Sequence, residues 1–136
     1  MAAEYLLDSN ILIAAINETS RPLLSRLVSL APQRLHLSSI VLSELLTGAE
    51  KSGARAAERH AVVHELSRGM TPLPFDEAAA LVYAHIRAAM EAKGQLIGSY
   101  DMQIAAQAIS RKLTLVTGNL REFRRVPGLI SENWLR

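Results

Sequence analysis

The sequence contains no cysteine, which excludes disulfide bonds and thiolate metal ligands. Aromatic residues make up only 4% of it, too few for the stacking platforms with which OB-fold and RRM proteins bind single-stranded nucleic acid. No apolar run approaches the ~18 residues of a membrane span, and the start, MAAEYLLDSN, lacks the basic and apolar regions of a signal peptide. We therefore expect a cytoplasmic protein that makes no contact with a membrane.

No charge of one sign dominates either, because 15 Lys and Arg face 13 Asp and Glu. This composition does not by itself identify a nucleic-acid binder, and with so few aromatic residues any such contact should be mostly to phosphate. The 136 residues have the usual length of one domain, and they show no repeat, low-complexity run or linker. We predict a single domain over residues 1–136.

Apolar strand patterns alternate with amphipathic helical patterns along the chain. The stretch YLLDSN, Tyr5 to Asn10, and the run LTLVT, residues 113–117, have the composition of buried parallel strands, and shorter strands are expected at 35–37, in TPLPF and near Leu129 and Ile130. Helices are predicted at 11–17, 23–31, 40–50, 53–69, 76–93 and 100–112. This order predicts a three-layer α/β/α fold with a parallel sheet of four or five strands.

Three carboxylates occupy comparable places in this pattern. Asp8 directly follows the first strand, Glu44 lies one turn into the helix after another strand, and Asp101 comes three residues after Gly98. Any one of them alone could simply stabilise a helix start. In a parallel sheet, however, these places lie on one edge, and three acids there would repel one another unless a cation sits between them.

The predicted ligands are all oxygen atoms, without cysteine or histidine in the cluster. Such a set favours Mg²⁺, or Mn²⁺ in its place, over Zn²⁺. An ion of this kind supports phosphoryl chemistry, because it lowers the pKa of a bound water and offsets charge on the phosphate.

The turn after the LTLVT strand ends at the same edge of the sheet. Thr117 and Asn119 could orient a water or a carboxylate there, and Glu122 could bind a second ion. The same turn carries three arginines that could bind phosphate, or contact a protein partner, or simply be solvated: Arg121, Arg124 and Arg125.

Two other pairs have helical spacing. His60 and His64 are four residues apart, as metal ligands on a helix often are, but no third ligand is evident. Tyr83 and Arg87 share a helix face, which packing explains, although Arg87 could pair with an acid of the site.

Long stretches of the sequence are also familiar as a set. LLDSNILI, SSIVLSELLTGAEKS and GQLIGSYDMQIAAQAISRKLTLVTGNLREFRRVPGLISENW resemble the PIN-domain ribonucleases, and closely the VapC toxins of bacterial type II toxin–antitoxin modules. The resemblance implies an acidic site at Asp8, Glu44 and Asp101, with Asn119 and Glu122 at a fourth, more variable position. Asp8 and Asp101 match the usual Mg²⁺ ligands of that family.

The resemblance further implies an endoribonuclease toxin that blocks translation by cutting structured RNA, often a tRNA and sometimes initiator tRNA, leaving a 3′-hydroxyl and a 5′-phosphate. It implies a homodimer, and a larger hetero-oligomer with a VapB-type antitoxin whose C-terminal segment enters the acidic groove. Two residues depart from the family pattern while keeping its chemistry: Ser9 stands for the commoner threonine, and Ser99 for a common proline.

The residues alone leave two other functions open. One is phosphotransfer through an aspartyl-phosphate at Asp8, although such enzymes commonly have an acid two residues further on, where this chain has Asn10. The other is a non-catalytic binding subunit of a toxin–antitoxin-like complex, whose acids merely cap helices.

Overall fold

Four short parallel strands form the sheet at the centre of the computed structural model, which describes residues 2–136. Their order across the sheet is β2-β1-β3-β4, so β1 and β3 are the two inner strands. The strands are β1 (Tyr5–Leu7), β2 (Leu35–His36), β3 (Thr114–Val116) and β4 (Ser131–Glu132). The predicted α/β fold with a parallel sheet is confirmed, with four strands.

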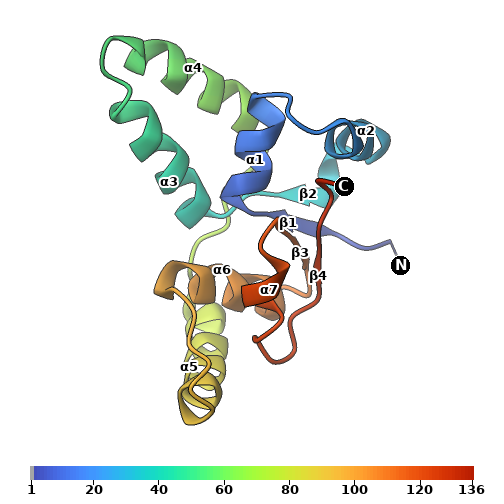
Figure 1. Cartoon of the computed structure of the whole chain (residues 1–136), viewed down its shortest axis with the longest axis vertical. Helices are drawn as coiled ribbons and strands as arrows, with labels where there is room; N and C mark the ends of the chain where they lie inside the picture. Colours follow the sequence, from blue (N-terminus) through green and yellow to red (C-terminus); the bar gives the residue numbers. More distant parts are fainter. Residues whose placement is uncertain (1) are drawn as a thin grey trace.

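Helices cover both sides of this sheet (Figure 1). In that view α1 to α4 lie above the sheet and α5 to α7 below it. The helices are α1 (Ser9–Ile16), α2 (Arg21–Ser29), α3 (Ser39–Glu50), α4 (Ala56–Ser67), α5 (Glu77–Ala92), α6 (Ser99–Ser110) and α7 (Leu120–Phe123), with 3-10 turns η1 (Pro32–Arg34) and η2 (Gly53–Arg55). Among the described residues, none of these helices combines the length and the apolar character needed to cross a membrane.

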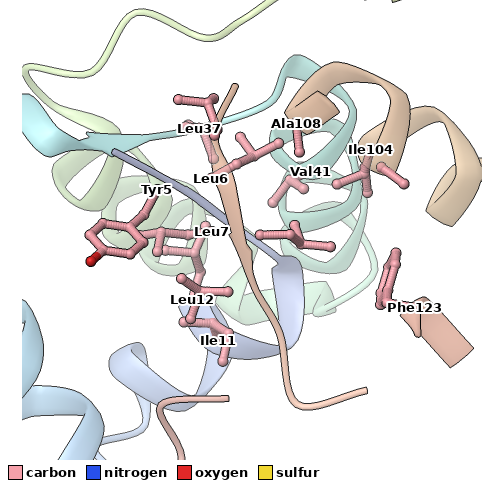
Figure 2. Packing of buried hydrophobic residues seen from close by; sticks show 14 of the residues in the cluster. Tyr5, Leu6, Leu7, Ile11, Leu12, Leu37, Val41, Ile104, Ala108 and Phe123 are labelled. Carbon is pink, nitrogen blue, oxygen red and sulfur yellow. The ribbon is translucent and has the colours of Figure 1, made fainter. Parts of the chain in front are cut away.

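The core forms where β1 and β3 meet the inner faces of α1, α3 and α6. All three residues of β1 and all three of β3 are buried, as expected for inner parallel strands. Figure 2 shows how the side chains of Leu6, Leu7, Val41 and Ile104 pack around the strands. This packing holds the two strands in place, and it thereby fixes the position of the polar residues at their ends.

The carboxyl ends of β1 and β3 lie side by side. Leu7 pairs with Val116 in the register of the two strands, and the backbone N–H of Asp8 donates to the carbonyl of Val116 at 2.9 Å. Helix α6 runs back along the sheet before the chain enters β3, so its first turn lies at this same edge. Residues that are about 90 positions apart in the sequence therefore converge there.

Two of the weaker strand predictions are wrong in detail. TPLPF forms a single bridge, between Leu73 and Ser38, because Pro72 and Pro74 cannot donate backbone hydrogen bonds to a ladder. The last strand begins at Ser131, just after the predicted Leu129 and Ile130.

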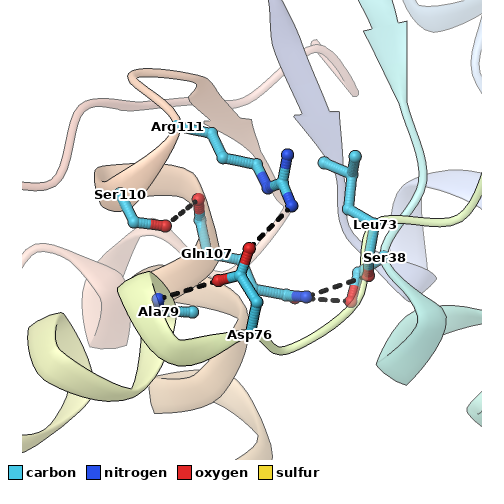
Figure 3. A network of polar contacts seen from close by, with 7 residues as sticks. All are labelled: Ser38, Leu73, Asp76, Ala79, Gln107, Ser110 and Arg111. Carbon is cyan, nitrogen blue, oxygen red and sulfur yellow. Dashed lines mark hydrogen bonds and ion pairs between the residues drawn. The ribbon is translucent and has the colours of Figure 1, made fainter.

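A buried polar network joins the two halves of the fold (Figure 3). The Ser38 hydroxyl donates to Oε1 of Gln107 at 2.6 Å, and Nε2 of Gln107 donates to the carbonyl of Leu73 at 3.0 Å. Both Ser38 and Gln107 are completely buried. Gln107 therefore ties α6 to the segment that leaves β2, and so supports the position of α3 as well.

Replacing Gln107 with alanine should destabilise the protein by about 2 to 3 kcal/mol, because it leaves the buried Ser38 hydroxyl without an acceptor and opens a cavity. Urea unfolding followed by circular dichroism would measure this loss. The matched control is Gln103→Ala, one turn earlier on the same helix and partly exposed, which should cost less than about 0.5 kcal/mol. Equal losses in the two variants would contradict the structural role of the network.

Candidate active site

Asp8 is the buried centre of the polar cluster at the carboxyl ends of β1 and β3. Its side chain is only 4% exposed. Oδ1 accepts the backbone N–H of Ser9 at 2.8 Å, so Asp8 caps α1, and Oδ2 accepts the hydroxyl of Thr117 at 2.8 Å. Burial raises the pKa of Asp8 from its usual value, while these hydrogen bonds act against that shift.

A second layer of hydrogen bonds fixes the groups that hold Asp8. The side-chain amide of Asn10 donates to Oδ2 of Asp8 at 3.2 Å and accepts the backbone N–H of Gly118 at 3.0 Å. The hydroxyl of Thr117 also accepts the backbone N–H of Asn119 at 3.0 Å. The start of α1 and the turn after β3 are thereby locked to each other around one carboxylate.

Glu44 approaches the cluster from the exposed side of α3. The Ser9 hydroxyl is 3.4 Å from Oε2 of Glu44 and donates to it. Partial burial raises the pKa of Glu44, and the charge of Asp8 raises it further. Because α3 begins at Ser39 and is capped by Ser38, Glu44 does not cap this helix.

Asp101 has the most perturbed carboxyl group of the cluster. Burial, followed by the charges of Asp8, Glu122 and Glu44 in that order, raises its pKa to about 6. It lies in the first turn of α6, yet the structure shows no side-chain cap there, and Gly98 occupies the cap position. Asp101 therefore does not cap α6 with its side chain, although its place in the first turn suits the helix dipole, and its pKa is set by burial and by the other acids.

The turn after β3 contributes the remaining predicted residues. Glu122 is half-buried in α7, near enough for its charge to act on Asp101. Asn119 precedes α7 without capping it through its side chain. The three arginines of this turn, Arg121, Arg124 and Arg125, are exposed, and within the described part of the chain they form no ion pair.

The sequence patterns missed three contributors to the site. Ser9 links Asp8 to Glu44, while Asn10 donates directly to Asp8 and is itself held by the backbone N–H of Gly118. A Cβ at position 118 would lie 2.8 Å from Cδ1 of Leu135, so the leucine side chain would have to shift to admit one. Ser9 and Asn10 lie directly after Asp8, so a search for polar neighbours of the carboxylate would have marked them.

The other predicted pairs lie outside this cluster. His60 pairs with Glu50 at 3.1 Å on the outer surface, and His64 is exposed. Arg87 donates to the Tyr83 hydroxyl at 2.9 Å and to Glu91, so it does not pair with an acid of the site. The His60 contact thus joins α4 to α3, and the Arg87 contacts lie within α5.

The donor chemistry of the cluster fits a hard divalent cation. All four acids offer oxygen, and across residues 2–136 none of the four is in an ion pair with Lys, Arg or His. In the same residues no three His, Asp or Glu side chains stand close enough to hold an ion as they are. A cation would therefore have to draw the carboxylates closer together, and its positive charge would offset their mutual repulsion.

An apolar groove begins at Glu44 and runs away from the cluster between α1, α3 and α4. Its volume is about 290 Å³, and its lining includes Ile13, Leu45, Arg59 and Val62 beside Glu44. Ile13 and Val62 are exposed there, at 48% and 37%. A groove of this kind offers an apolar segment a place to bind directly beside the acids.

The fold and the acidic edge together point to one class of protein. A family model of the PIN domain matches residues 5–129 of the chain. The chain is 42% identical over 132 residues to a tRNA(fMet)-specific endonuclease VapC of Salmonella typhimurium, covering 96% of this chain and 98% of that one. It is 39% identical over 131 residues to ribonuclease VapC2 of Rickettsia felis, covering 96% and 97%.

A solved structure agrees with these relatives. DNA-bound VapBC from Salmonella typhimurium contains a chain that matches with a TM-score of 0.89 at 40% identity, covering 98% of this chain and 99% of that one. The chain belongs to the VapC family, the PIN-domain ribonuclease toxins of VapBC toxin–antitoxin systems. The sequence-based expectation of a ribonuclease is confirmed, and the readings as a phosphotransferase or a non-catalytic subunit find no support among these relatives.

The raised pKa of Asp101 makes the stability of the metal-free protein depend on pH. A carboxyl group whose pKa is about 6 when folded and 3.8 otherwise binds its proton more tightly in the folded state. Its contribution to stability is therefore fully present below about pH 4 and is lost as the pH rises through about 6. In EDTA, the melting temperature should therefore rise as the pH is lowered from about 7 to about 5.

Asp101→Asn should flatten this rise, since the neutral amide has no proton to bind. Thermal melts of the two proteins over the pH series would show the difference. Curves that stay parallel would mean that Asp101 is not perturbed in the folded state.

Proposed function

We propose that the chain is a Mg²⁺-dependent endoribonuclease whose reaction takes place at Asp8, Glu44 and Asp101. The observation that carries this proposal is the convergence of four acids at one edge of the sheet, where burial and then the three other carboxylates raise the pKa of Asp101. Such mutual repulsion is relieved by a bound cation and has no evident structural use. Mn²⁺ has the same preference for oxygen ligands and should substitute.

The residues of the cluster have different roles in binding the ion and the phosphate. Asp8 supplies a carboxylate fixed by Ser9, Asn10 and Thr117, and Asp101 supplies a second. Glu44 and Glu122 flank this pair with further negative charge. The ion, when bound, would lower the pKa of the attacking water and offset charge on the phosphodiester. Asn119 lies beside Thr117 and is placed to orient a water or a phosphate oxygen.

The substrate we propose is a structured RNA, and specifically a tRNA. The name of the Salmonella relative, a tRNA(fMet)-specific endonuclease, supports initiator tRNA as the first to test. The exposed and unpaired Arg121, Arg124 and Arg125 beside the acids suit binding of RNA phosphates on either side of the cut. Interference with translation would follow directly from loss of that tRNA.

Asp8→Asn and Asp101→Asn should each lower cleavage of initiator tRNA at least about 100-fold, since a ligand of the ion matters more than the residues that orient ligands. The assay incubates purified protein with the tRNA in Mg²⁺ or EDTA and resolves the fragments by gel electrophoresis. Authentic fragments should carry a 5′-phosphate, which a ligation assay detects and which separates them from the products of metal-independent ribonucleases.

Asp76→Asn is the matched control for both variants. Asp76 caps α5 as Asp8 caps α1, but it pairs with Arg111 far from the cluster, and asparagine can keep the cap. It should leave cleavage unchanged. If Asp8→Asn and Asp76→Asn behaved alike, Asp8 would be a helix cap and nothing more.

A VapB-type antitoxin is the partner we propose for the apolar groove beside Glu44. The groove offers Ile13 and Val62 to an apolar segment, and Glu44 at its end suits a basic side chain of that segment. We further propose that the toxin is a homodimer and that the antitoxin joins it in a larger hetero-oligomer. The solved VapBC complex of Salmonella typhimurium, which contains a relative of this chain, supports a VapB-type partner.

Ile13→Asp should weaken binding of the VapB-type antitoxin by at least about 10-fold, since a charge would be buried against the apolar segment. Isothermal titration calorimetry with the purified antitoxin would measure the change. Leu81→Asp, an equally polar substitution at an exposed leucine on α5, is the control. Undiminished affinity of the Ile13 variant would place the antitoxin elsewhere.

A further inference from the structure

A second hollow lies on the other side of Glu44, between α3 and the start of α6. Its volume is about 440 Å³, within the range of small-molecule sites. Its lining residues, which bring both polar groups and apolar carbon surface to it, are Ser43, Glu44, Thr47, Gly48, Lys51 and Tyr100. Because it contains Glu44 and the residue that precedes Asp101, it is continuous with the acidic cluster.

Tyr100 is an unusual aromatic residue in this chain. Its side chain is 64% exposed, whereas Tyr5, Phe123 and Trp134 are buried in the core. Tyr83 packs edge-on against Phe75 and also contacts Arg87. Among residues 2–136, Tyr100 therefore has the only aromatic ring left exposed, and it lies at the wall of a hollow beside the proposed reaction centre.

The polar groups of the hollow are unequally available to a ligand. The hydroxyls of Ser43 and Thr47 donate to carbonyl groups within α3, at 2.7 Å each, so they have no free proton to offer. Lys51 caps the end of α3, is exposed, and has no ion-pair partner in the described part of the chain. Tyr100 and Lys51 are thus the groups of the hollow that are available to bind a ligand.

An exposed ring and an ammonium group suit a nucleotide. An aromatic ring stacks on any base, and a lysine neutralises a phosphate. The other side of Glu44 has the apolar groove with its isoleucine and valine side chains, so an apolar peptide is better served there than in a hollow lined by hydroxyls and charges.

We propose that this hollow is a nucleotide subsite, in which Tyr100 stacks on a base next to the scissile phosphodiester and Lys51 binds a phosphate of the same strand. The proposal rests on the proposed ribonuclease site, since it extends the path of the RNA from the acidic cluster over α3. It assigns substrate contacts to two residues outside the acidic cluster. It also explains how a chain with few aromatic residues holds an unpaired base.

A binding experiment tests the subsite without depending on cleavage. The background is Asp8→Asn, so that bound RNA stays intact, and the probes are a fluorescein-labelled oligouridylate and an abasic ribose–phosphate strand of the same length. Fluorescence anisotropy in Mg²⁺ gives the dissociation constants. Tyr100→Ala should weaken oligouridylate binding about 10-fold and leave the abasic strand unaffected, while Tyr100→Phe should bind like the parent, because the ring alone stacks.

Lys51→Gln should weaken the binding of both strands equally and reduce the dependence of binding on salt, as expected when one phosphate contact is lost. Leu81→Ala and Lys93→Gln, an exposed apolar residue and an exposed lysine of the α5 region, are the controls and should change neither strand. Melting temperatures of all variants check that they are folded.

Two results would overturn the subsite. One is a loss in Tyr100→Ala that is equal for both strands, or no loss at all, because stacking requires a base. The other is normal RNA binding with weakened binding of the antitoxin, which would make the hollow a protein-binding surface. A failed cleavage assay with these binding results intact would instead count against the proposed reaction and leave the subsite standing.

A cleavage assay then separates stacking from a general structural effect. In the protein that retains Asp8, Tyr100→Ala should raise KM for the RNA about 10-fold with little change in kcat, since Tyr100 is proposed to hold the substrate and not to react. Tyr100→Phe should restore KM. A fall in kcat at unchanged KM would show that the substitution disturbs Asp101 instead.

Discussion

Repulsion between carboxylates is the constraint on which the acidic edge of this protein depends. Burial, together with the charges of Asp8, Glu122 and Glu44, raises the pKa of Asp101 to about 6. The fold imposes this proximity by placing Asp8 at the end of an inner strand and Asp101 in the first turn of the helix that leads into the neighbouring strand. Leu6, Leu7 and Ile104, packed beneath them, prevent the acids from moving apart by displacement of the backbone. The repulsion between the acids is then reduced by binding of a proton or a cation.

Asp8 is held in a way that differs from the other three acids. It accepts hydrogen bonds on both oxygens, from groups on two different segments, and this keeps its side chain in one place while burial raises its pKa. The arrangement extends to the end of the chain. Gly118 lies against Leu135, whose carbonyl accepts the hydroxyl of Ser20, and so the turn after β3 is enclosed between Asn10 and the C-terminal segment. The precision of the site therefore depends on contacts that no single stretch of sequence contains.

The strong local patterns predicted the fold well, because β1 and β3 are short, apolar and followed by polar residues, and because Asp76 and Ser38 are ordinary helix caps. The failures have physical reasons. Leu129 and Ile130 look like a strand by composition, yet Ile130 is 67% exposed and β4 pairs through Ser131 and Glu132, since an edge strand is chosen by register and not by hydrophobicity. The links from Ser9 to Glu44 and from Gly118 to Asn10 join residues 35 and 108 positions apart, so only the folded chain shows them.

Glu44 has a place in both proposals about what this surface binds. It ends the apolar groove that we assign to the antitoxin and it also lines the polar hollow that we assign to a nucleotide. A basic side chain of the antitoxin that reached Glu44 would neutralise a charge that the site otherwise offers to the metal ion, and would stand beside the path of the RNA. On these proposals inhibition requires no conformational change in the toxin. By these proposals, an antitoxin side chain bound to Glu44 would weaken the attraction of Asp8 and Asp101 for the ion and would reach toward the RNA from the groove side.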